Sequence, residues 1–237
     1  MAAEPDFSLV IPVFNEGANV PALFASLKQF VPATAEVLIC YDFPADNTLP
    51  AIQAVPEADR PAQLRLIHNT LGRGVRFAID AGMKAAYSRV VIVTMADLSD
   101  DFSQLQEMAH RVRAGATVVC PSRYMQGGRQ IGGPLLKSFL SRAAGFTLFH
   151  LAGLPTHDPT NSFKAYDASY LARTPIESPA GFVLALELTV KAHKQRLRIE
   201  EFPTTWRDRT AGESRFNLRK WLPLYLRWYF YAFSRSM

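Results

Sequence analysis

Cysteine is scarce in this sequence, which has only Cys40 and Cys120 among 237 residues. Each cysteine ends a short apolar run, so we expect two buried structural thiols and neither a disulfide framework nor a cysteine metal site. The five histidines show no spacing typical of metal ligands. Internal repeats and low-complexity tracts are also missing, which excludes solenoids and disordered chains.

Long uncharged apolar runs are missing as well. A spanning helix needs about 20 predominantly apolar residues, and no segment reaches that length without charges. Residues 1–6 are acidic and lack the apolar core of a signal peptide. We therefore expect a cytoplasmic protein.

The net charge of +5 is concentrated at the C-terminal end. Residues 207–237 contain seven lysines and arginines against two acidic residues, so this segment carries the whole excess. Residues 221–233 are also rich in Trp, Tyr and Phe. Aromatic and basic side chains together suit the headgroup zone of a membrane, although a buried C-terminal helix explains the aromatics equally well. A nucleic-acid-binding module is disfavoured, because the aromatic residues of this chain cluster in one helical segment. In such modules the aromatic residues spread over the face of a sheet, where bases stack on them.

Strands and helices alternate in the first half of the chain. A short apolar run bounded by polar residues indicates a buried strand, and apolar residues at a period of 3.6 indicate an amphipathic helix. These patterns predict strands at residues 8–13, 36–40, 64–68, 89–94 and 116–120, with amphipathic helices at 20–30 and 105–112. Such alternation predicts an α/β fold with a mostly parallel central sheet covered by helices, in a single domain.

The second half has a different pattern. Glycine-rich residues 127–134 predict a loop, and residues 135–154 a mostly apolar helix that either packs on the core or lies in a membrane interface. A further helix at 182–194, a strand at 198–206 and a C-terminal amphipathic helix at 221–233 complete the expected elements.

Polar residues follow four of the predicted strands directly. Glu16, Asp42, Arg73 and Asp97 all come at or soon after the carboxyl end of a strand. Ligands of open α/β sheets bind at that edge, and a mixture of hydrogen-bond acceptors, a cation and a carboxylate suits a nucleotide. Asp97 could hold a hard cation through oxygen, while the alternative is that Asp97–Asp101 cap the next helix. The P-loop and the Gly-rich dinucleotide fingerprint are both missing.

Several ordered motifs make the sequence recognisable. They are Ile11 to Glu16, Asp42 with Asp46-Asn47-Thr48, Gly72-Arg73-Gly74, Asp97-Leu98-Ser99, Ser122-Arg123-Tyr124, Asp158-Pro159-Thr160-Asn161-Ser162-Phe163-Lys164, Gly181-Phe182 with Glu187, Arg207-Asp208-Arg209 and Gly212-Glu213-Ser214. In these motifs the chain resembles the family 2 glycosyltransferases of the A-type fold, especially the dolichol/polyprenyl-phosphate mannose or glucose synthase branch. The resemblance implies a catalytic domain over residues 1–216, with a nucleotide-sugar half at 1–124 and an acceptor half at 125–216, followed by a basic, aromatic helix at 217–237.

Two departures from the family's pattern stand out. The family has Asp-X-Asp at the metal strand, where this chain has Met95 in place of the first Asp. The second loop reads Tyr41-Asp42-Phe43-Pro44 where the family has Asp-Asp-Gly-Ser. The resemblance still implies Mg²⁺ or Mn²⁺ held by Asp97 together with donor phosphates and water, and Asp100 or Asp101 is available to compensate for Met95.

The resemblance also implies roles for individual residues. The nucleotide sugar is assigned to Pro12, Phe14, Asn15, Glu16, Asp42, Gly72, Arg73 and Asp97. The acceptor is assigned to Ser122, Arg123, Asp158, Ser162, Lys164 and Ser214. Catalysis is assigned to Asp97, Glu187, Arg123, Arg207 and Arg209. Other roles remain open: Arg207 or Arg209 as a surface partner of Asp208 or Glu201, Glu187 as the i,i+4 partner of Lys191, and Asp158 as a turn residue.

The implied activity is inverting transfer of a hexose from a GDP- or UDP-linked sugar to a polyprenyl or dolichyl phosphate at the inner face of a membrane. A saccharide hydroxyl is the alternative acceptor, for which Glu187 is the candidate base. A non-catalytic nucleotide-sugar-binding or scaffold protein with a degenerate metal motif is the alternative of another class. The sequence leaves open whether a membrane-anchored partner protein supplies an anchor.

Overall fold

The strands and helices expected in the first half of the chain are all present in the computed structural model, which describes residues 4–209 and 218–234, with side chains of the second range from residue 221. The strands are β1 (Ser8–Pro12), β2 (Glu36–Tyr41), β3 (Gln63–His68), β4 (Val90–Val93), β5 (Val118–Ser122), β6 (Arg129–Ile131), β7 (Lys164–Asp167), β8 (Ile199–Pro203) and β9 (Thr205–Arg207). The helices are α1 (Val20–Phe30), α2 (Thr48–Ala54), α3 (Val75–Ala85), α4 (Leu105–Arg113), α5 (Leu135–Ala152), α6 (Ala168–Arg173), α7 (Leu184–Lys194) and α8 (Leu218–Phe233).

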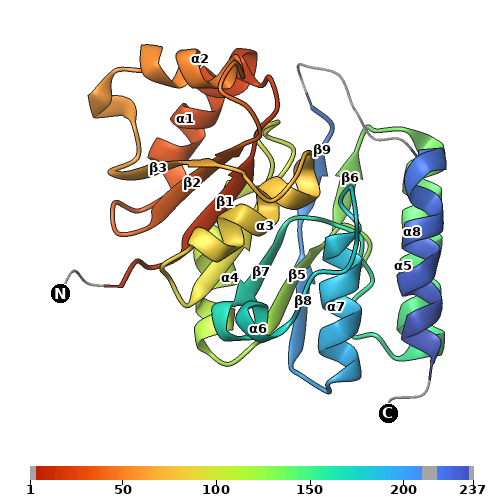
Figure 1. Cartoon of the computed structure of the whole chain (residues 1–237). Helices are drawn as coiled ribbons and strands as arrows, with labels where there is room; N and C mark the ends of the chain where they lie inside the picture. The colour runs from red at the N-terminus through yellow and green to blue at the C-terminus, as the bar shows by residue number, and fades with distance from the viewer. Residues whose placement is uncertain (1–3, 210–217, 235–237) are drawn as a thin grey trace.

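The central sheet has seven strands in the order β3-β2-β1-β4-β7-β5-β8 (Figure 1). Strands β3, β2, β1 and β4 are parallel neighbours, so their carboxyl ends lie at one edge, as the sequence predicts. Strand β7 runs antiparallel between β4 and β5, with Val93 opposite Lys164. Because β7 is reversed, the segment that precedes it lies at the same edge as those carboxyl ends.

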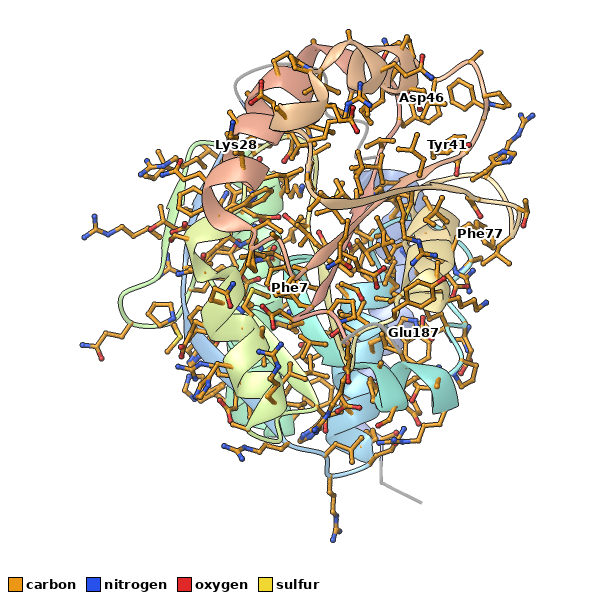
Figure 2. All side chains as sticks on the ribbon, turned by 90° about the vertical axis from the view of Figure 1, so that its left-hand side faces the viewer. Phe7, Lys28, Tyr41, Asp46, Phe77 and Glu187 are labelled. Atoms are coloured by element: carbon orange, nitrogen blue, oxygen red, sulfur yellow. The ribbon has the colours of Figure 1, made fainter. Side chains whose placement is uncertain are left out.

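Alternating apolar residues of the strands divide the core between the two faces of the sheet. On one face, Leu9, Ile11, Val37 and Ile39 pack with the apolar stripes of α1 and α4. On the other face, Val10, Leu38, Val91 and Val93 pack with apolar residues of α3 and α7. Figure 2 shows side chains filling both layers, with Phe7 in the interior. Cys40 and Cys120 are buried free thiols, as expected.

The second half departs from the expected elements at several points, because β6, β7 and α6 were not predicted. The strand predicted at residues 198–206 is two strands in different sheets, since β8 joins the central sheet and β9 pairs with β6. The turn between them carries residues 204–209 away from the central sheet and over the strand edge. Helices α5 and α8 lie side by side, on the opposite side of the molecule from α1 and α2 (Figure 1). Within the described part of the chain, no helix has the length and apolar character needed to cross a bilayer.

Candidate active site

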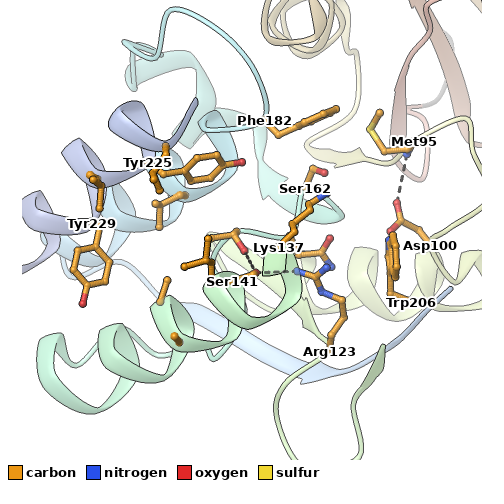
Figure 3. Close-up of a pocket in the computed structure, with 18 of the residues that line it drawn as sticks. Met95, Asp100, Arg123, Lys137, Ser141, Ser162, Phe182, Trp206, Tyr225 and Tyr229 are labelled. Carbon is orange, nitrogen blue, oxygen red and sulfur yellow. Dashed lines mark hydrogen bonds between the residues drawn. The ribbon is translucent and has the colours of Figure 1, made fainter. Parts of the chain in front are cut away.

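A cavity of about 380 Å³ opens where the sheet edge meets α5 and α8. Its residues come from the β4 loop, from the turn after β5, from α5 and α8, and from the loops before β7, α7 and α8. Figure 3 shows charged and polar side chains at one end, including Asp100, Arg123 and Lys137, and Tyr225 and Tyr229 toward the other. The cavity therefore joins a charged end to an apolar limb.

Two carboxylates, Asp97 and Asp100, contribute to the charged end. Leu98 between them adopts φ 59°, and this left-handed residue turns the loop back on itself. The Asp100 carboxylate consequently accepts hydrogen bonds from Thr94 Oγ1 at 2.8 Å and from the Met95 backbone N–H at 3.4 Å. Asp101 instead accepts from Ser103 N–H and caps the next helical turn. The capping alternative thus holds for Asp101, while Asp97 and Asp100 face the cavity.

Asp100 lies where ionisation is unfavourable. Burial raises its pKa to about 7, and the negative charge of Asp97 acts in the same direction. The hydrogen bonds from Thr94 and Met95 and the charge of Arg123 act against this rise. The loop therefore presents a carboxyl, that of Asp100, that titrates near neutral pH.

Arg123 is the most firmly held cation of the cavity. Its Nε and Nη2 donate to the two carboxylate oxygens of Asp158 at 2.7 and 2.8 Å, and its backbone N–H donates to the same carboxylate at 3.0 Å. Burial by itself lowers the pKa of Arg123, but the charge and hydrogen bonds of Asp158 outweigh it and raise the pKa above its ordinary value. Asp158 is fully buried, so its role is to fix the guanidinium at the cavity wall.

Two further cations line the same end. Arg209 Nη2 lies 2.9 Å from Asp97 Oδ2, so its guanidinium pairs with the cavity carboxylate, while its backbone N–H donates to Asp208 at 3.1 Å. Lys137 projects from the first turns of α5, and burial together with the charges of Arg123 and Arg209 lowers its pKa. Three cations thus line this end, two of them held by Asp158 and Asp97, and their N–H donors suit phosphate.

The opposite limb lies between α5 and α8. It is lined by Leu140, Ala143, Ala144, Thr147, Phe182, Leu186, Leu222, Tyr225, Leu226 and Tyr229. The α5 residues recur at helical spacing along one face, as do those of α8, so the two helices present continuous apolar walls. Small alanines on α5 leave the space that the limb occupies.

Asp97 apart, the residues assigned to the nucleotide sugar lie on the neighbouring strand ends and not in the lining of this cavity. Asp42 accepts hydrogen bonds from Asn69 Nδ2 and from the Gly74 N–H, each at 2.7 Å, and so organises the turn that contains Gly72 and Arg73. Phe14 is 41% exposed, with its ring 5.3 Å from that of Phe43.

Asp46 organises the end of β1, a role that the sequence pattern did not reveal. Its buried carboxylate accepts from the Asn15 N–H, with Asn15 at φ 56°, and from Thr48. Figure 2 shows Asp46 and Tyr41 near this edge. The adjoining Glu16 accepts from Asn19 Nδ2 at 2.6 Å, while Pro12 is buried at the end of β1.

Several predicted site residues have other contacts. Glu187 is fully buried outside the cavity, where it accepts from the N–H groups of Glu177 and Ser178 and pairs with Lys191 at 2.8 Å. Glu187 therefore makes the i,i+4 pair that was the alternative to a role as base. Buried Lys164 donates to the Asp158 carbonyl and does not reach the cavity.

The remaining assigned residues divide in the same way. Buried Ser122 accepts from the N–H groups of Tyr124 and Met125, and exposed Arg207 joins the edge through its backbone N–H to Ser99 O. Ser162 and Arg123 both line the cavity. Ser214 lies outside the described residues.

Sequence reasoning missed Lys137, Trp206 and the tyrosines of the apolar limb. Trp206 lies in β9 next to the charged end, as Figure 3 shows. Lys137 interrupts an otherwise apolar segment, and that interruption is the signal by which it could have been found. Nothing in the local pattern shows that Tyr225 and Tyr229 face α5.

The charged end fits a hard divalent cation, though with few protein ligands. In residues 4–209 and 218–234, no three His, Cys, Asp or Glu side chains are grouped to hold a metal. Magnesium commonly takes one or two carboxylates and completes its shell with substrate phosphates and water. Asp97 and Asp100 supply that number, and Met95 lines the cavity without an oxygen ligand.

Comparison with known proteins identifies a family and two similar enzymes. Residues 8–174 match the family Glycosyl transferase family 2. The chain is 27% identical over 215 residues to the polyprenol monophosphomannose synthase of Mycolicibacterium smegmatis, covering 88% of this chain and 80% of that protein. It is also 27% identical over 213 residues to the undecaprenyl-phosphate mannosyltransferase of Micrococcus luteus, with 88% and 86% covered.

Solved structures show the same fold. Glucosyl-3-phosphoglycerate synthase from Mycobacterium tuberculosis in complex with phosphoglyceric acid superposes with a TM-score of 0.71 at 14% identity, over 97% of this chain and 80% of that one. The same enzyme in complex with Mn²⁺, UDP-glucose and phosphoglyceric acid gives 0.67 at 16% identity, over 97% and 78%. The expected α/β nucleotide-sugar transferase fold is thereby confirmed.

Proposed function

The chain belongs to glycosyl transferase family 2, and we propose that it moves a hexose from a GDP- or UDP-linked sugar to a polyprenyl phosphate at a membrane surface. The observation that carries the acceptor is the continuity of the cavity. Arg123, Lys137 and Arg209 surround its charged end, and the apolar limb leads away between α5 and α8. A lipid phosphate has the same division, with an anionic head on an apolar chain.

The names of the two bacterial relatives support this acceptor class, because both refer to a polyprenyl phosphate or polyprenol monophosphate and both align with 88% of the chain. The names also refer to mannose, which makes a GDP- or UDP-linked hexose the donor class to test first.

The reaction requires a new bond at the sugar's C1. A phosphate oxygen of the acceptor attacks C1 from the face opposite the leaving group, and the bond from C1 to the nucleoside diphosphate breaks with its electron pair on the diphosphate. The acceptor phosphate is ionised at neutral pH, so no strong base is required. Asp158 occupies the Nε–Nη2 edge of Arg123 and fixes the guanidinium, which offers the phosphate the N–H groups of its Nη1 side.

We assign Mg²⁺ or Mn²⁺ to Asp97, with Asp100 beside it. When bound, such a cation stabilises the negative charge that develops on the leaving diphosphate. The Arg209 guanidinium lies 2.9 Å from the Asp97 carboxylate and adds a second positive charge next to it.

The surface of α5 and α8 suits peripheral attachment to the inner face of a membrane. Leu135, Phe139 and Leu151 on α5 are 87%, 68% and 71% exposed, and Phe230 on α8 is 64% exposed. Apolar side chains of this size rarely gather on the surface of a soluble monomer without a partner. With the basic C-terminal segment, they favour anionic lipid, and a membrane there places the lipid acceptor beside the apolar limb.

The test measures transfer by the purified chain from GDP- and UDP-hexoses to undecaprenyl phosphate in detergent micelles, with Mg²⁺ or Mn²⁺ present or removed. We expect a lipid-linked hexose, with a loss of about 100-fold or more in Asp97→Asn because a bound cation supplies several kcal/mol of charge stabilisation. Asp59→Asn, which removes an exposed partner of Lys28, is the matched control. Unchanged turnover in Asp97→Asn would refute the role of Asp97.

Two other outcomes would replace the proposal. Transfer to a saccharide hydroxyl but not to the lipid phosphate would change the acceptor class. Binding of a nucleotide sugar without turnover on either acceptor would indicate a non-catalytic binding protein. Flotation with vesicles of neutral and anionic lipid tests membrane attachment, and flotation that ignores anionic lipid would contradict the charge argument.

A further inference from the structure

A hydrogen bond between α8 and α5 joins the two walls of the apolar limb at the end remote from the charged residues. The Tyr229 hydroxyl donates to Thr147 Oγ1 at 2.9 Å, and both residues line the cavity. In Figure 3 Tyr229 lies at the end opposite Met95, Asp100 and Trp206. Lys137 and Thr147 are ten residues apart on α5, so the limb extends about 15 Å from the charged end to this bond.

An exposed aromatic surface begins directly beyond Tyr229. Its ring lies 5.3 Å from the ring of Phe230 and 5.3 Å from that of Phe233, and these two residues are 64% and 41% exposed. Tyr229 therefore belongs both to the cavity lining and to this aromatic surface.

We propose that the Tyr229–Thr147 hydrogen bond is a gate that makes the enzyme sensitive to acceptor chain length. This inference rests on the proposed function, because it requires a prenyl phosphate with its head at the charged end. A short prenyl chain ends inside the limb and leaves the bond intact. A long chain must separate the two hydroxyls before it can extend onto the aromatic surface.

A purely structural role for the bond is a weaker explanation, because α8 is anchored independently. Trp228 Nε1 donates to Ser178 Oγ at 2.9 Å, and Arg227 pairs with Glu177 at 2.7 Å. These contacts hold the other face of α8 against the loop before α7. Loss of the Tyr229 hydroxyl therefore opens the limb and leaves the helix attached.

The test compares kcat/KM for undecaprenyl phosphate with kcat/KM for geranyl phosphate, whose chain is shorter than the limb, in the same detergent micelles. Tyr229→Phe and Thr147→Val each remove one hydroxyl and keep the side-chain shape. We expect the ratio of long to short acceptor to rise about fivefold in each variant, the effect of one neutral hydrogen bond. The double variant should show no further rise, because both changes remove the same bond.

Tyr231→Phe removes a hydroxyl from the same helix outside the cavity lining and serves as the control. An unchanged ratio in Tyr229→Phe and Thr147→Val, or a full additive rise in the double variant, would overturn the gate. A failure of the proposed function gives a different result, because wild-type protein would then use neither prenyl phosphate. That result would refute the gate as well. If wild-type protein uses both lipids and the variants leave the ratio unchanged, the gate is refuted and the proposed function stands.

Discussion

Asp158→Asn is the substitution that best tests how the charged end is organised. The side chains of Asp158 and Arg123 are 0% and 10% exposed, and the carboxylate accepts three hydrogen bonds from Arg123. Removing one partner of a buried ion pair costs about 3–5 kcal/mol. Asparagine keeps one carbonyl oxygen and Arg123 borders the cavity, so we expect the lower end, about 3 kcal/mol.

This loss is measurable by urea denaturation and by thermal unfolding. For a chain of this size each kcal/mol lowers Tm by about 2–4 °C, which predicts a fall of about 6–12 °C. The protein should stay folded, because domains of this kind are stable by about 5–15 kcal/mol. In the variant the Arg123 side chain is no longer fixed before the acceptor binds. The entropy lost when binding orders this side chain should raise KM for the phosphate acceptor by about two- to tenfold.

Asp59→Asn is the control for these measurements. Its partner Lys28 and Asp59 itself are 62% and 47% exposed, and exposed pairs contribute at most about 1 kcal/mol. Equal losses of stability in Asp158→Asn and Asp59→Asn would refute the reasoning. An acceptor KM that falls in Asp158→Asn would equally refute the view that Asp158 positions Arg123.

Two further predictions concern buried carboxyls. Glu187→Gln removes the buried partner of Lys191 but leaves its ion pair with Glu177 at 2.8 Å, so unfolding measurements should show a loss of about 1–3 kcal/mol. The kcat measured well below Tm should stay near wild type, and a kcat that collapses in a folded variant would support Glu187 as a base. For Asp100, the folded-state pKa of about 7 lies above the unfolded value of 3.8, so the folded protein keeps a proton that the unfolded chain loses between these pH values. The free energy of unfolding in EDTA should therefore fall as pH rises through this window, and Asp100→Asn should remove that part of the slope.

Much of the fold was predictable because its signals are local. The strand ends carrying Glu16, Asp42 and Asp97 follow short apolar runs, and the observed order β3-β2-β1-β4 brings them to one edge as expected. The reversed strand β7 was not predictable, because Lys164–Asp167 is short and its pairing with β4 depends on contacts with residues more than 70 positions earlier. Its reversal is what carries Asp158 and Ser162 to that edge.

The candidate site was predictable in its residue types more than in its contacts. The motifs singled out Asp97, Arg123, Asp158 and Arg209, and the structure brings all four to the charged end. A sequence motif does not specify which carboxylate forms an ion pair with each arginine. Arg209 pairs with Asp97, which is separated from it by more than a hundred residues, so only the turn between β8 and β9 decides that contact.

By itself, the sequence determined the alternation of strands and helices, the polar strand ends and the basic, aromatic C-terminal segment, because each is recorded in periodicity or composition over a few residues. Tertiary structure alone decided that Glu187 turns inward to Lys191, that Asp100 folds back toward Met95, and that α5 and α8 enclose an apolar limb. Each of these depends on surfaces that meet only when distant segments pack together, and the burial they create determines which polar groups stay available for chemistry.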